Sequence, residues 1–424
     1  MHVGFVVSLG TLAVAAPLQK RQNSAYPAPD TRGPTPKPEW VATYESAKAA
    51  GKIPTFAPAQ SSGGVPYYAP GVDTGAGGVC SWSVSHCFSD DDVYQAPTGM
   101  YSTSFDDGPL PNSPTLYRFL AAQNQSATHF LIGGNIVNNP DEFDLLVETG
   151  GHVGVHTWSH PQMTTLTDLE VLGELGWTAQ IIMDRSGFAP SWWRPPQGDV
   201  DNRVRAIAKE VFGLRLAGWD VDSSDWCLSE GGGSSCDASH IASQSDLEDE
   251  LRGWQTGSKS PGILGLEHEL TSHSVQAFIN TFDGIADNGW DARCIPDLFG
   301  DDWYANAVRS ETPDESYKIG TGPNGGIDDT DSSSTASAST TLPSSVSSTS
   351  HASDSLSLSS VQGSSAAAMI TSAASAVSSS ADHHPTAQSQ VATPSSDHSG
   401  GVVLSPYSAG GWTAIFAVVL AFFV

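Results

Sequence analysis

A regular alternation of short apolar segments and helical patterns runs through the middle of the chain. Apolar, strand-like segments occur at 101–105, 128–132, 152–156, 214–220 and 263–266, and amphipathic helical patterns follow at 113–120, 141–148, 168–184, 200–211, 245–254 and 275–288. Because a return to a parallel neighbour needs a crossover, usually a helix, the alternation predicts an α/β fold with parallel strands. About six to seven such units favour a distorted or incomplete (β/α) barrel of about seven strands over a flat sheet.

Composition divides the 424 residues into a domain and flanking segments. Residues 1–16 are apolar and rich in small side chains, which is typical of a cleaved secretory signal. Residues 17–95 are rich in Pro and Gly and predict a propeptide with an N-terminal arm, either disordered or packed on the domain surface. The domain itself is expected at 96–300. Residues 301–399 are expected to form a disordered, O-glycosylated stalk, because they carry too few apolar side chains to offset the entropy of ordering.

The C-terminal residues carry the pattern of a glycosylphosphatidylinositol (GPI) attachment signal. Small residues at 399–401 precede a spacer and a thirteen-residue apolar end, 412–424. A helix needs about 20 apolar residues to span a bilayer, so this end is too short for a permanent span. We expect residues 400–424 to be removed and the lipid to be attached at Ser399 or Gly400. A simple C-terminal membrane anchor is the alternative.

The charge balance excludes several partners. Lys and Arg number 18 against 46 Asp and Glu, which gives a net charge of −28. A nucleic-acid binder needs a basic face, and attachment to anionic lipid needs a polybasic patch, so neither partner is expected. We expect a secreted monomer at the cell surface, attached to the plasma membrane or the cell wall, whose contact with membrane is made only through the GPI anchor.

Five cysteines in a secreted chain predict disulfides with one thiol left over. Cys227 and Cys236 flank a flexible run of glycines, so we expect a bridge between them. Cys80, Cys87 and Cys294 compete for a second bridge, and pairing of Cys80 or Cys87 with Cys294 is the expectation for it. The sequence contains no CxxC pair, which argues against a thiolate zinc site.

Titratable side chains follow one predicted strand after another. Asp106 and Asp107 end the first strand, and His156 and His160 follow the third. In a barrel of this class the carboxyl ends of the strands form the active-site face, so these residues should meet at one mouth. Two imidazoles and one carboxylate make a facial site for Zn²⁺ or a similar divalent ion, and the second carboxylate is left to act as a base. For the aspartates alone, a simple turn would be the default interpretation.

Five short motifs resemble, in order, those of the polysaccharide deacetylase family, which is carbohydrate esterase family 4 with the NodB-homology domain. The motifs are Ser104–Pro109, His156–His160, Arg194–Pro196, Asp222–Trp226 and Leu266–His268. The resemblance covers about residues 99–290. The layout of signal, stalk and lipid anchor is similar to that of fungal chitin deacetylases, so it implies hydrolysis of N-acetyl groups in cell-wall chitin or its oligomers, giving chitosan and acetate.

The resemblance also implies a role for each residue. One divalent metal, Zn or Co, would be held by Asp107, His156 and His160. The remaining roles are Asp106 as general base, Arg194 orienting that base, His268 as general acid, Asp225 pairing with the acid (Asp222 is the second choice), the Gln197 backbone N–H as oxyanion donor, and Trp226 and Leu266 as wall and floor of the acetyl pocket.

Three positions depart from the family pattern. Gln197 stands where the family more usually has Tyr or Phe, His129 stands where Phe is common, and Ser104 replaces the usual Thr. Asn124 begins an N-glycosylation sequon in a loop expected on the far end of the barrel.

Three alternative functions remain. They are an acetyl-xylan esterase, another deacetylase of the family such as a peptidoglycan deacetylase, and a non-catalytic wall protein that binds glycan through the same cleft.

Overall fold

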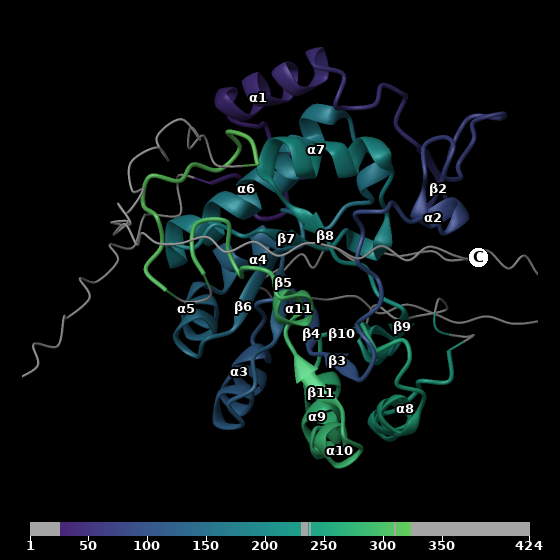
Figure 1. The fold of residues 1–424 in the computed structure, drawn as a ribbon, viewed down its shortest axis with the longest axis vertical. Helices are drawn as coiled ribbons and strands as arrows, with labels where there is room; N and C mark the ends of the chain where they lie inside the picture. Colours follow the sequence, from purple (N-terminus) through teal and green to yellow (C-terminus); the bar gives the residue numbers. More distant parts are fainter. Residues whose placement is uncertain (1–25, 230–235, 237–238, 309–310, 324–424) are drawn as a thin grey trace, which may run out of the picture. The chain divides into compact units, whose positions relative to one another are not determined.

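A computed structural model describes residues 26–229, 236, 239–308 and 311–323. Its centre is a seven-stranded sheet in which all paired neighbours run parallel, in the order β8-β7-β6-β5-β4-β10-β9 (Figure 1). The strands are β4 (Ser104–Gly108), β5 (Thr128–Leu131), β6 (His152–Val155), β7 (Trp192–Trp193), β8 (Arg215–Leu216), β9 (Val221–Asp222) and β10 (Gly265–His268). Around them are α3 (Ser113–Ala122), α4 (Gly133–Asn138), α5 (Pro140–Glu148), α6 (Asp168–Ser186), α7 (Asn202–Phe212), α8 (Gln244–Thr256), α9 (Ser272–Thr281) and α10 (Asp283–Asp287).

The two edges of the sheet are successive parts of one segment. Arg215–Leu216 pairs with β7 at one edge, and Val221–Asp222 pairs with β10 at the other, with only four residues between them. Because so short a connection must join both edges, the sheet curls toward closure without a β8–β9 pairing. The prediction of an incomplete α/β barrel of about seven strands is confirmed.

Alternate residues along the strands pack on opposite faces of the sheet, as the two-residue period of a strand requires. The adjacent tryptophans of β7 illustrate this, because Trp193 belongs to the large cluster shared with the helices and Trp192 to a smaller second cluster. Phe130 and Leu264 share that smaller cluster. Asp106 and His268 are neighbours in register, and Asp106 also pairs with Phe130, so both site residues face the same side as Phe130.

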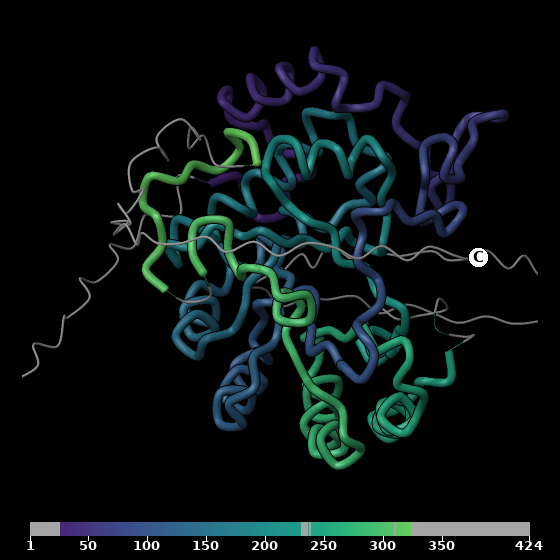
Figure 2. The backbone as a smooth tube through the Cα atoms, viewed as in Figure 1, coloured from purple at the N-terminus to yellow at the C-terminus, as the bar shows by residue number. Residues whose placement is uncertain are grey.

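Of the two expectations for the N-terminal arm, disorder or packing on the domain surface, the structure shows packing for residues 26–95. Helix α1 (Pro38–Ala49) lies against α6 and α7 (Figures 1 and 2). Trp40 is fully buried and donates from Nε1 to the carbonyl of Ile319 at 3.0 Å. The indoles of Trp158 and Trp177 donate to the arm, to the carbonyls of Ala28 and Thr35. These contacts tie the arm to the domain through aromatic side chains.

The folded part also extends past the expected boundary at residue 300. Trp303, Tyr304, Tyr317 and Ile319 are buried in the main hydrophobic cluster. These side chains are part of the core, so the described residues 301–308 and 311–323 are not stalk. The remaining elements are β1 (Gln60–Ser62) paired with β2 (Val65–Tyr67), α2 (Trp82–Ser85), β3 (Met100–Ser102) paired with β11 (Asp291–Arg293), and α11 (Ile295–Phe299).

The described residues contain two disulfides. Cys227 pairs with Cys236, as expected. The second bridge joins Cys80 to Cys87, so the expectation that one of them pairs with Cys294 is wrong. Cys80 and His86 have left-handed backbone angles that fold the chain tightly around α2, and the Cα atoms of the two cysteines come within 5.0 Å. Cys294 is buried at the start of α11 and is part of neither bridge.

Several predictions concern residues outside the described part. These are the secretory signal at 1–16, the stalk beyond residue 323, and the GPI signal with its attachment at Ser399 or Gly400. Among the helices that the structure describes, none combines the length and apolar character needed to cross a membrane. Asn124 is exposed in the turn between α3 and β5, at the end of the sheet opposite the carboxyl ends of the strands.

Candidate functional site

Asp107, His156 and His160 converge where β4 and β6 end. The Oδ1 atom of Asp107 lies 3.3 Å from Nε2 of His156 and 3.3 Å from Nε2 of His160. One ligand atom from each of the three residues falls within 4.8 Å of the others. The Oδ1 atom is buried and has no hydrogen-bond partner among the described residues. A buried carboxylate oxygen between two ring nitrogens is a donor set that fits a divalent cation.

Neighbouring groups prepare the two imidazoles for that task. The Nδ1 of His156 lies 2.8 Å from the carbonyl of Arg194, so Nδ1–H donates and Nε2 keeps its lone pair. Burial lowers the pKa of His160, which favours the neutral form that a metal ligand needs. Burial opposes ionisation of Asp107, but the positive charge that His160 and His156 carry when they are protonated outweighs burial and holds the pKa of this carboxyl well below its usual range.

Several residues of the site have a strained backbone conformation. Asp107, Thr157, His160 and Gln197 all have φ between 55° and 71°, in the left-handed region that non-glycine residues avoid. Helix α4 holds the end of β4, since Asn135 donates from Nδ2 to the carbonyl of Asp107 at 2.8 Å. Such angles persist because the surrounding contacts over-determine them.

Asp106 is the second carboxylate of the pair and points differently from Asp107. It is 2% exposed, and its Oδ1 accepts from Nη1 of Arg194 at 2.8 Å. Arg194 is itself fully buried and donates to Ser104 Oγ and to the carbonyls of Ala217 and Gly218. The other oxygen of Asp106 lies 3.7 Å from Nε2 of His156. One oxygen of the carboxylate is therefore held by Arg194, while the other faces His156.

His268 ends β10 beside Asp106. Its Nδ1 lies 2.7 Å from Oδ1 of Asp225, and its backbone N–H donates to the other carboxylate oxygen at 2.8 Å. Burial opposes protonation, but Asp225 outweighs it and raises the pKa of His268 to about 10. Of the two aspartates left open by the sequence, the structure pairs Asp225 with His268, while Asp222 accepts from the backbone of Ser224.

The pocket residues lie at the same mouth. Leu266 is two positions before His268 on β10 and is buried, and Trp226 is partly buried in the turn after β9. Gln197 lies in a 3₁₀ turn, Pro196–Gly198, directly after Arg194 and Pro195, and its side chain accepts from Gln162 at 3.0 Å. The structure thus brings together, at the carboxyl ends of the strands, all the residues that the sequence singled out for metal and acid–base roles.

A buried glutamate near the site was missed by sequence reasoning. Glu174 of α6 is fully buried and accepts from the backbone N–H groups of Trp158 and Ser159 at 2.7 and 2.8 Å, and from the N–H of Gly33 at 2.7 Å. It therefore pins the loop between His156 and His160. Its sequence signal is a charged residue amid the apolar and small residues 171–176, on the face of α6 that should be buried.

His129 also has partners that the sequence did not reveal. Its Nδ1 forms a short, fully buried contact with Glu269, the residue after His268. Tyr117 donates its hydroxyl to the second oxygen of Glu269 at 2.7 Å, and the N–H of Glu269 donates to the carbonyl of Asp106 at 3.1 Å. The Nδ1 atom of His129 is thus paired within the protein, on the helix side of the sheet, while its buried Nε2 has no hydrogen-bond partner among the described residues.

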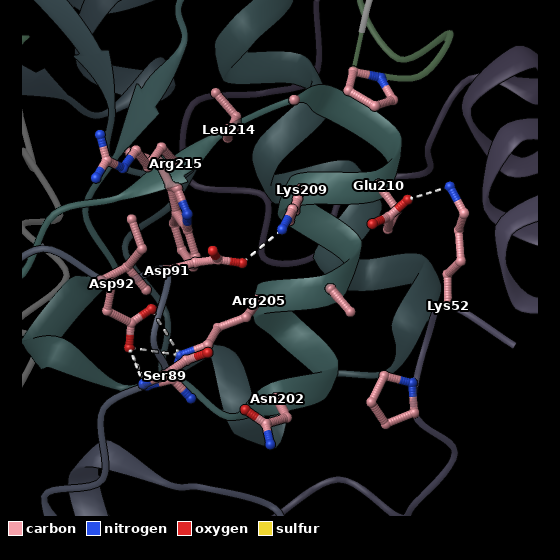
Figure 3. A pocket seen from close by; sticks show the side chains of 16 residues that line it. Lys52, Ser89, Asp91, Asp92, Asn202, Arg205, Lys209, Glu210, Leu214 and Arg215 are labelled. Atoms are coloured by element: carbon pink, nitrogen blue, oxygen red, sulfur yellow. Dashed lines mark hydrogen bonds and ion pairs between the residues drawn. The ribbon is translucent and has the colours of Figure 1, made fainter. Parts of the chain in front are cut away.

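A separate pocket of about 560 Å³ lies beside α7 (Figure 3). Its cations already face carboxylates: Lys52 pairs with Glu210, Arg205 with Asp92, Lys209 with Asp91, and Arg215 with Asp301. None of the predicted catalytic or metal residues lines it. With its charges paired internally, this pocket offers no free cation to an anionic ligand and is not the candidate site.

Comparisons with known proteins agree with this geometry. Residues 94–216 match the family model described as polysaccharide deacetylase. The chain is 46% identical over 237 residues to chitin deacetylase 3 of Cryptococcus neoformans, covering 55% of this chain and 56% of that protein. It is 32% identical over 225 residues to chitin deacetylase 1 of Saccharomyces cerevisiae, covering 53% of this chain and 68% of that protein. The chain therefore belongs to the polysaccharide deacetylase family.

The matches cover only part of each chain. The chain spans little more than half the length of the Cryptococcus relative. Among solved structures, the chitin deacetylase from the fungal pathogen Colletotrichum lindemuthianum is 21% identical with a TM-score of 0.43, covering 50% of this chain and 92% of that one. A likeness this distant carries no argument about chemistry.

Proposed function

We propose that the protein removes N-acetyl groups from N-acetylglucosamine residues of cell-wall chitin, giving chitosan and acetate, in a reaction that depends on a divalent metal, Zn or Co. The observation that carries the proposal is the arrangement around Asp107, His156 and His160. Asp106 stands beside these residues, and His268 is its neighbour across the β4–β10 pair. A base and an acid at one cation site are the parts that amide hydrolysis requires.

Each protein group has a task that follows from its contacts. Asp107, His156 and His160 would hold a divalent cation, which would supply Lewis-acid activation of water and of a carbonyl oxygen. Asp106, held through Oδ1 by Arg194, accepts the proton of the attacking water on Oδ2. The backbone N–H of Gln197 donates to the carbonyl oxygen as negative charge develops there.

His268 completes the reaction by protonating the leaving nitrogen. Asp225 holds its Nδ1, so Nε2 is the atom that carries the transferable proton. An amine is a poor leaving group unless it is protonated as the C–N bond breaks, so this step governs whether acetate is released. Trp226 and Leu266 would enclose the acetyl methyl group.

The choice of chitin rests on the relatives and on the expected layout. The relatives cited above carry the name chitin deacetylase. A strongly acidic chain suits a neutral polymer and its cationic product better than an anionic polymer. We place the protein at the cell surface, held by the GPI anchor proposed from residues 399–424.

The experiment that tests the proposal is an assay of acetate release with the purified protein. Chitin oligomers, colloidal chitin and acetyl-xylan are compared, each with and without a chelator. Release from the two chitin substrates that stops on chelation supports the proposal. Release from acetyl-xylan alone would make the protein an esterase, and binding to chitin without acetate release would make it a glycan-binding wall protein.

A further inference from the structure

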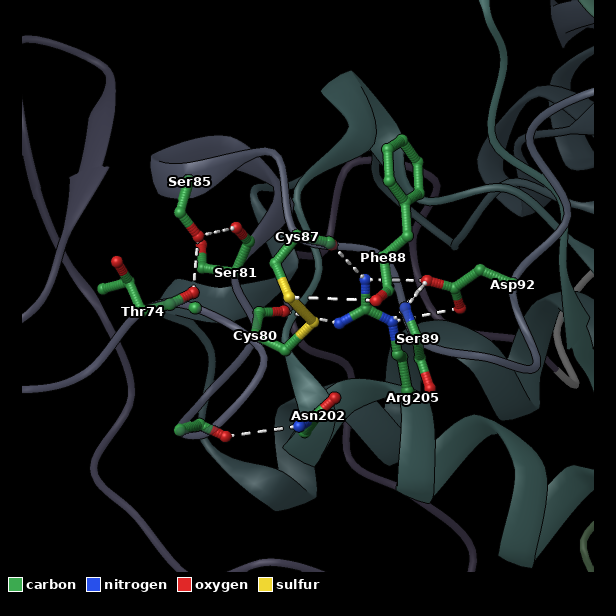
Figure 4. Close-up of a disulfide and its surroundings, with 12 residues drawn as sticks. Thr74, Cys80, Ser81, Ser85, Cys87, Phe88, Ser89, Asp92, Asn202 and Arg205 are labelled. Atoms are coloured by element: carbon green, nitrogen blue, oxygen red, sulfur yellow. Dashed lines mark hydrogen bonds and ion pairs between the residues drawn. A yellow bond between two sulfur atoms is a disulfide. The ribbon is translucent and has the colours of Figure 1, made fainter. Parts of the chain in front are cut away.

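The loop closed by the Cys80–Cys87 disulfide is fixed firmly to the domain (Figure 4). Arg205 of α7 donates to the carbonyl of Cys80 at 2.6 Å and to that of Cys87 at 3.0 Å, and the same guanidinium pairs with Asp92. On the other side, Ser83 donates its hydroxyl to the buried carboxylate of Asp199. The short helix α2 within the loop therefore has a defined position.

Helix α2 begins with Trp82, which packs beside the loop that carries Gln197. The backbone N–H of Trp82 donates to the carbonyl of Val200 at 3.0 Å. Its ring fills the space over Gly198, where a Cβ atom would come within 2.4 Å of the indole. Gly198 directly follows Gln197, the expected oxyanion donor, so the indole stands next to the reaction site.

Trp82 meets a second indole at this place. Its ring lies 5.1 Å from that of Trp219, with the two planes tilted by 58°. Trp219 lies in the segment between β8 and β9, and the guanidinium of Arg194 is 6.0 Å from its ring centre. Arg194 in turn holds Asp106. Both indoles remain partly exposed, so a ligand can reach them.

We propose that Trp82 and Trp219 form a sugar-binding platform that holds the residue of the glycan next to the one that loses its acetyl group. The inference rests on the proposed function. A pyranose ring presents a face of C–H groups, which packs on an indole while its hydroxyl groups stay in water. Trp82 lies outside the residues 94–216 that match the family model, so the arm of this chain supplies part of the platform.

The test compares substrates of different length with variants of Trp82. Trp82→Leu fills the space over Gly198 without an aromatic face, whereas Trp82→Phe keeps an aromatic face. Val84→Ala on the same helix is the control, because the side chain of Val84 is 41% exposed. With a chitin pentamer, KM should rise about tenfold in Trp82→Leu, while kcat stays within about twofold. With N-acetylglucosamine alone, which has no second residue to occupy the platform, Trp82→Leu and the wild type should differ little. With the pentamer, Trp82→Phe should lie close to the wild type.

Calorimetric binding of the pentamer to the metal-loaded Asp106→Asn protein separates this inference from the proposed function. An affinity that falls about tenfold when Trp82→Leu is added supports the platform, whether or not the wild-type protein releases acetate. Equal affinity and equal KM in Trp82→Leu and wild type would overturn it. Thermal melting of each variant verifies folding. If Trp82→Leu is unfolded, the same comparison is made with Trp219→Leu, and equal affinity in that variant and the wild type would also overturn the platform.

Discussion

Replacing Asp225 with Asn should shift the alkaline limb of activity to lower pH. Asp225 is the carboxylate that holds Nδ1 of His268, and its charge is the main reason that the pKa of His268 is raised from 6.5 to about 10 in spite of burial. Asn has nearly the same shape but no charge. Without that carboxylate, burial lowers the pKa of His268 and only the weaker influence of Asp107 and Asp106 raises it, so the pKa should return to about its ordinary value.

The magnitude follows from the protonated fraction of His268. An imidazole with a pKa of about 10 is almost fully protonated at pH 8, whereas one with a pKa of ~6.5 is protonated to about 3%. If only the protonated form donates to the leaving nitrogen, kcat/KM at pH 8 should fall roughly 30-fold. At pH 6 most of the imidazole would still be protonated, and the loss should be only about twofold or less.

The assay is acetate release from a chitin pentamer, with kcat/KM measured from pH 5 to pH 10. Asp222→Asn is the matched control, because Asp222 lies three residues away and its side chain accepts from Ser224 and not from His268. The control should keep most of the wild-type alkaline limb. An alkaline limb in Asp225→Asn that coincides with that of the wild type would refute the role of Asp225 in keeping His268 protonated.

Three further predictions follow from other parts of the structure. Asp106→Asn should keep its bound metal and lose turnover by about 10²–10⁴-fold, whereas Asp107→Asn should lose the metal; the opposite pattern in metal analysis would mean that the two carboxylates are assigned the wrong way round. Glu174→Ala should lower the free energy of unfolding by about 3 kcal/mol in urea titrations, because buried donors lose their acceptor, and stability within about 0.5 kcal/mol of wild type would contradict this. The mature chain should end at Ser399 or Gly400 with a glycolipid attached, and a mass spectrum with an unmodified peptide ending at Val424 would refute the anchor.

The site could be anticipated because its residues lie in short contiguous motifs at the ends of strands. Parallel strands bring their carboxyl ends to one edge, so Asp106 and His268 could be expected to meet although they are 162 positions apart in the chain. The choice between Asp222 and Asp225 was harder. It depends on the 3₁₀ turn Asp225–Leu228, which follows β9 and brings Asp225 to His268, and a turn of this kind has no clear signature in the sequence.

Long-range packing explains what the sequence could not reveal about the arm. Residues 26–95 have the Pro- and Gly-rich composition of a loose leader, and their order depends on contacts with distant segments. Trp40, for example, donates to a carbonyl 279 positions away. The Cys80–Cys87 pairing likewise depends on a tight turn around α2, held by Arg205 from another helix. Periodicity and composition carry no record of such partners.

The most direct test of a metal-dependent deacetylase is acetate release as a function of metal restored to the chelated protein. Zn²⁺ or Co²⁺ is added in steps to metal-free protein with a chitin pentamer, and bound metal is measured in the same samples. The rate should rise with occupancy and level off at one ion per chain, and His160→Ala, which lacks one of the three donors, should stay near the metal-free rate. Full acetate release by the metal-free protein would contradict the account.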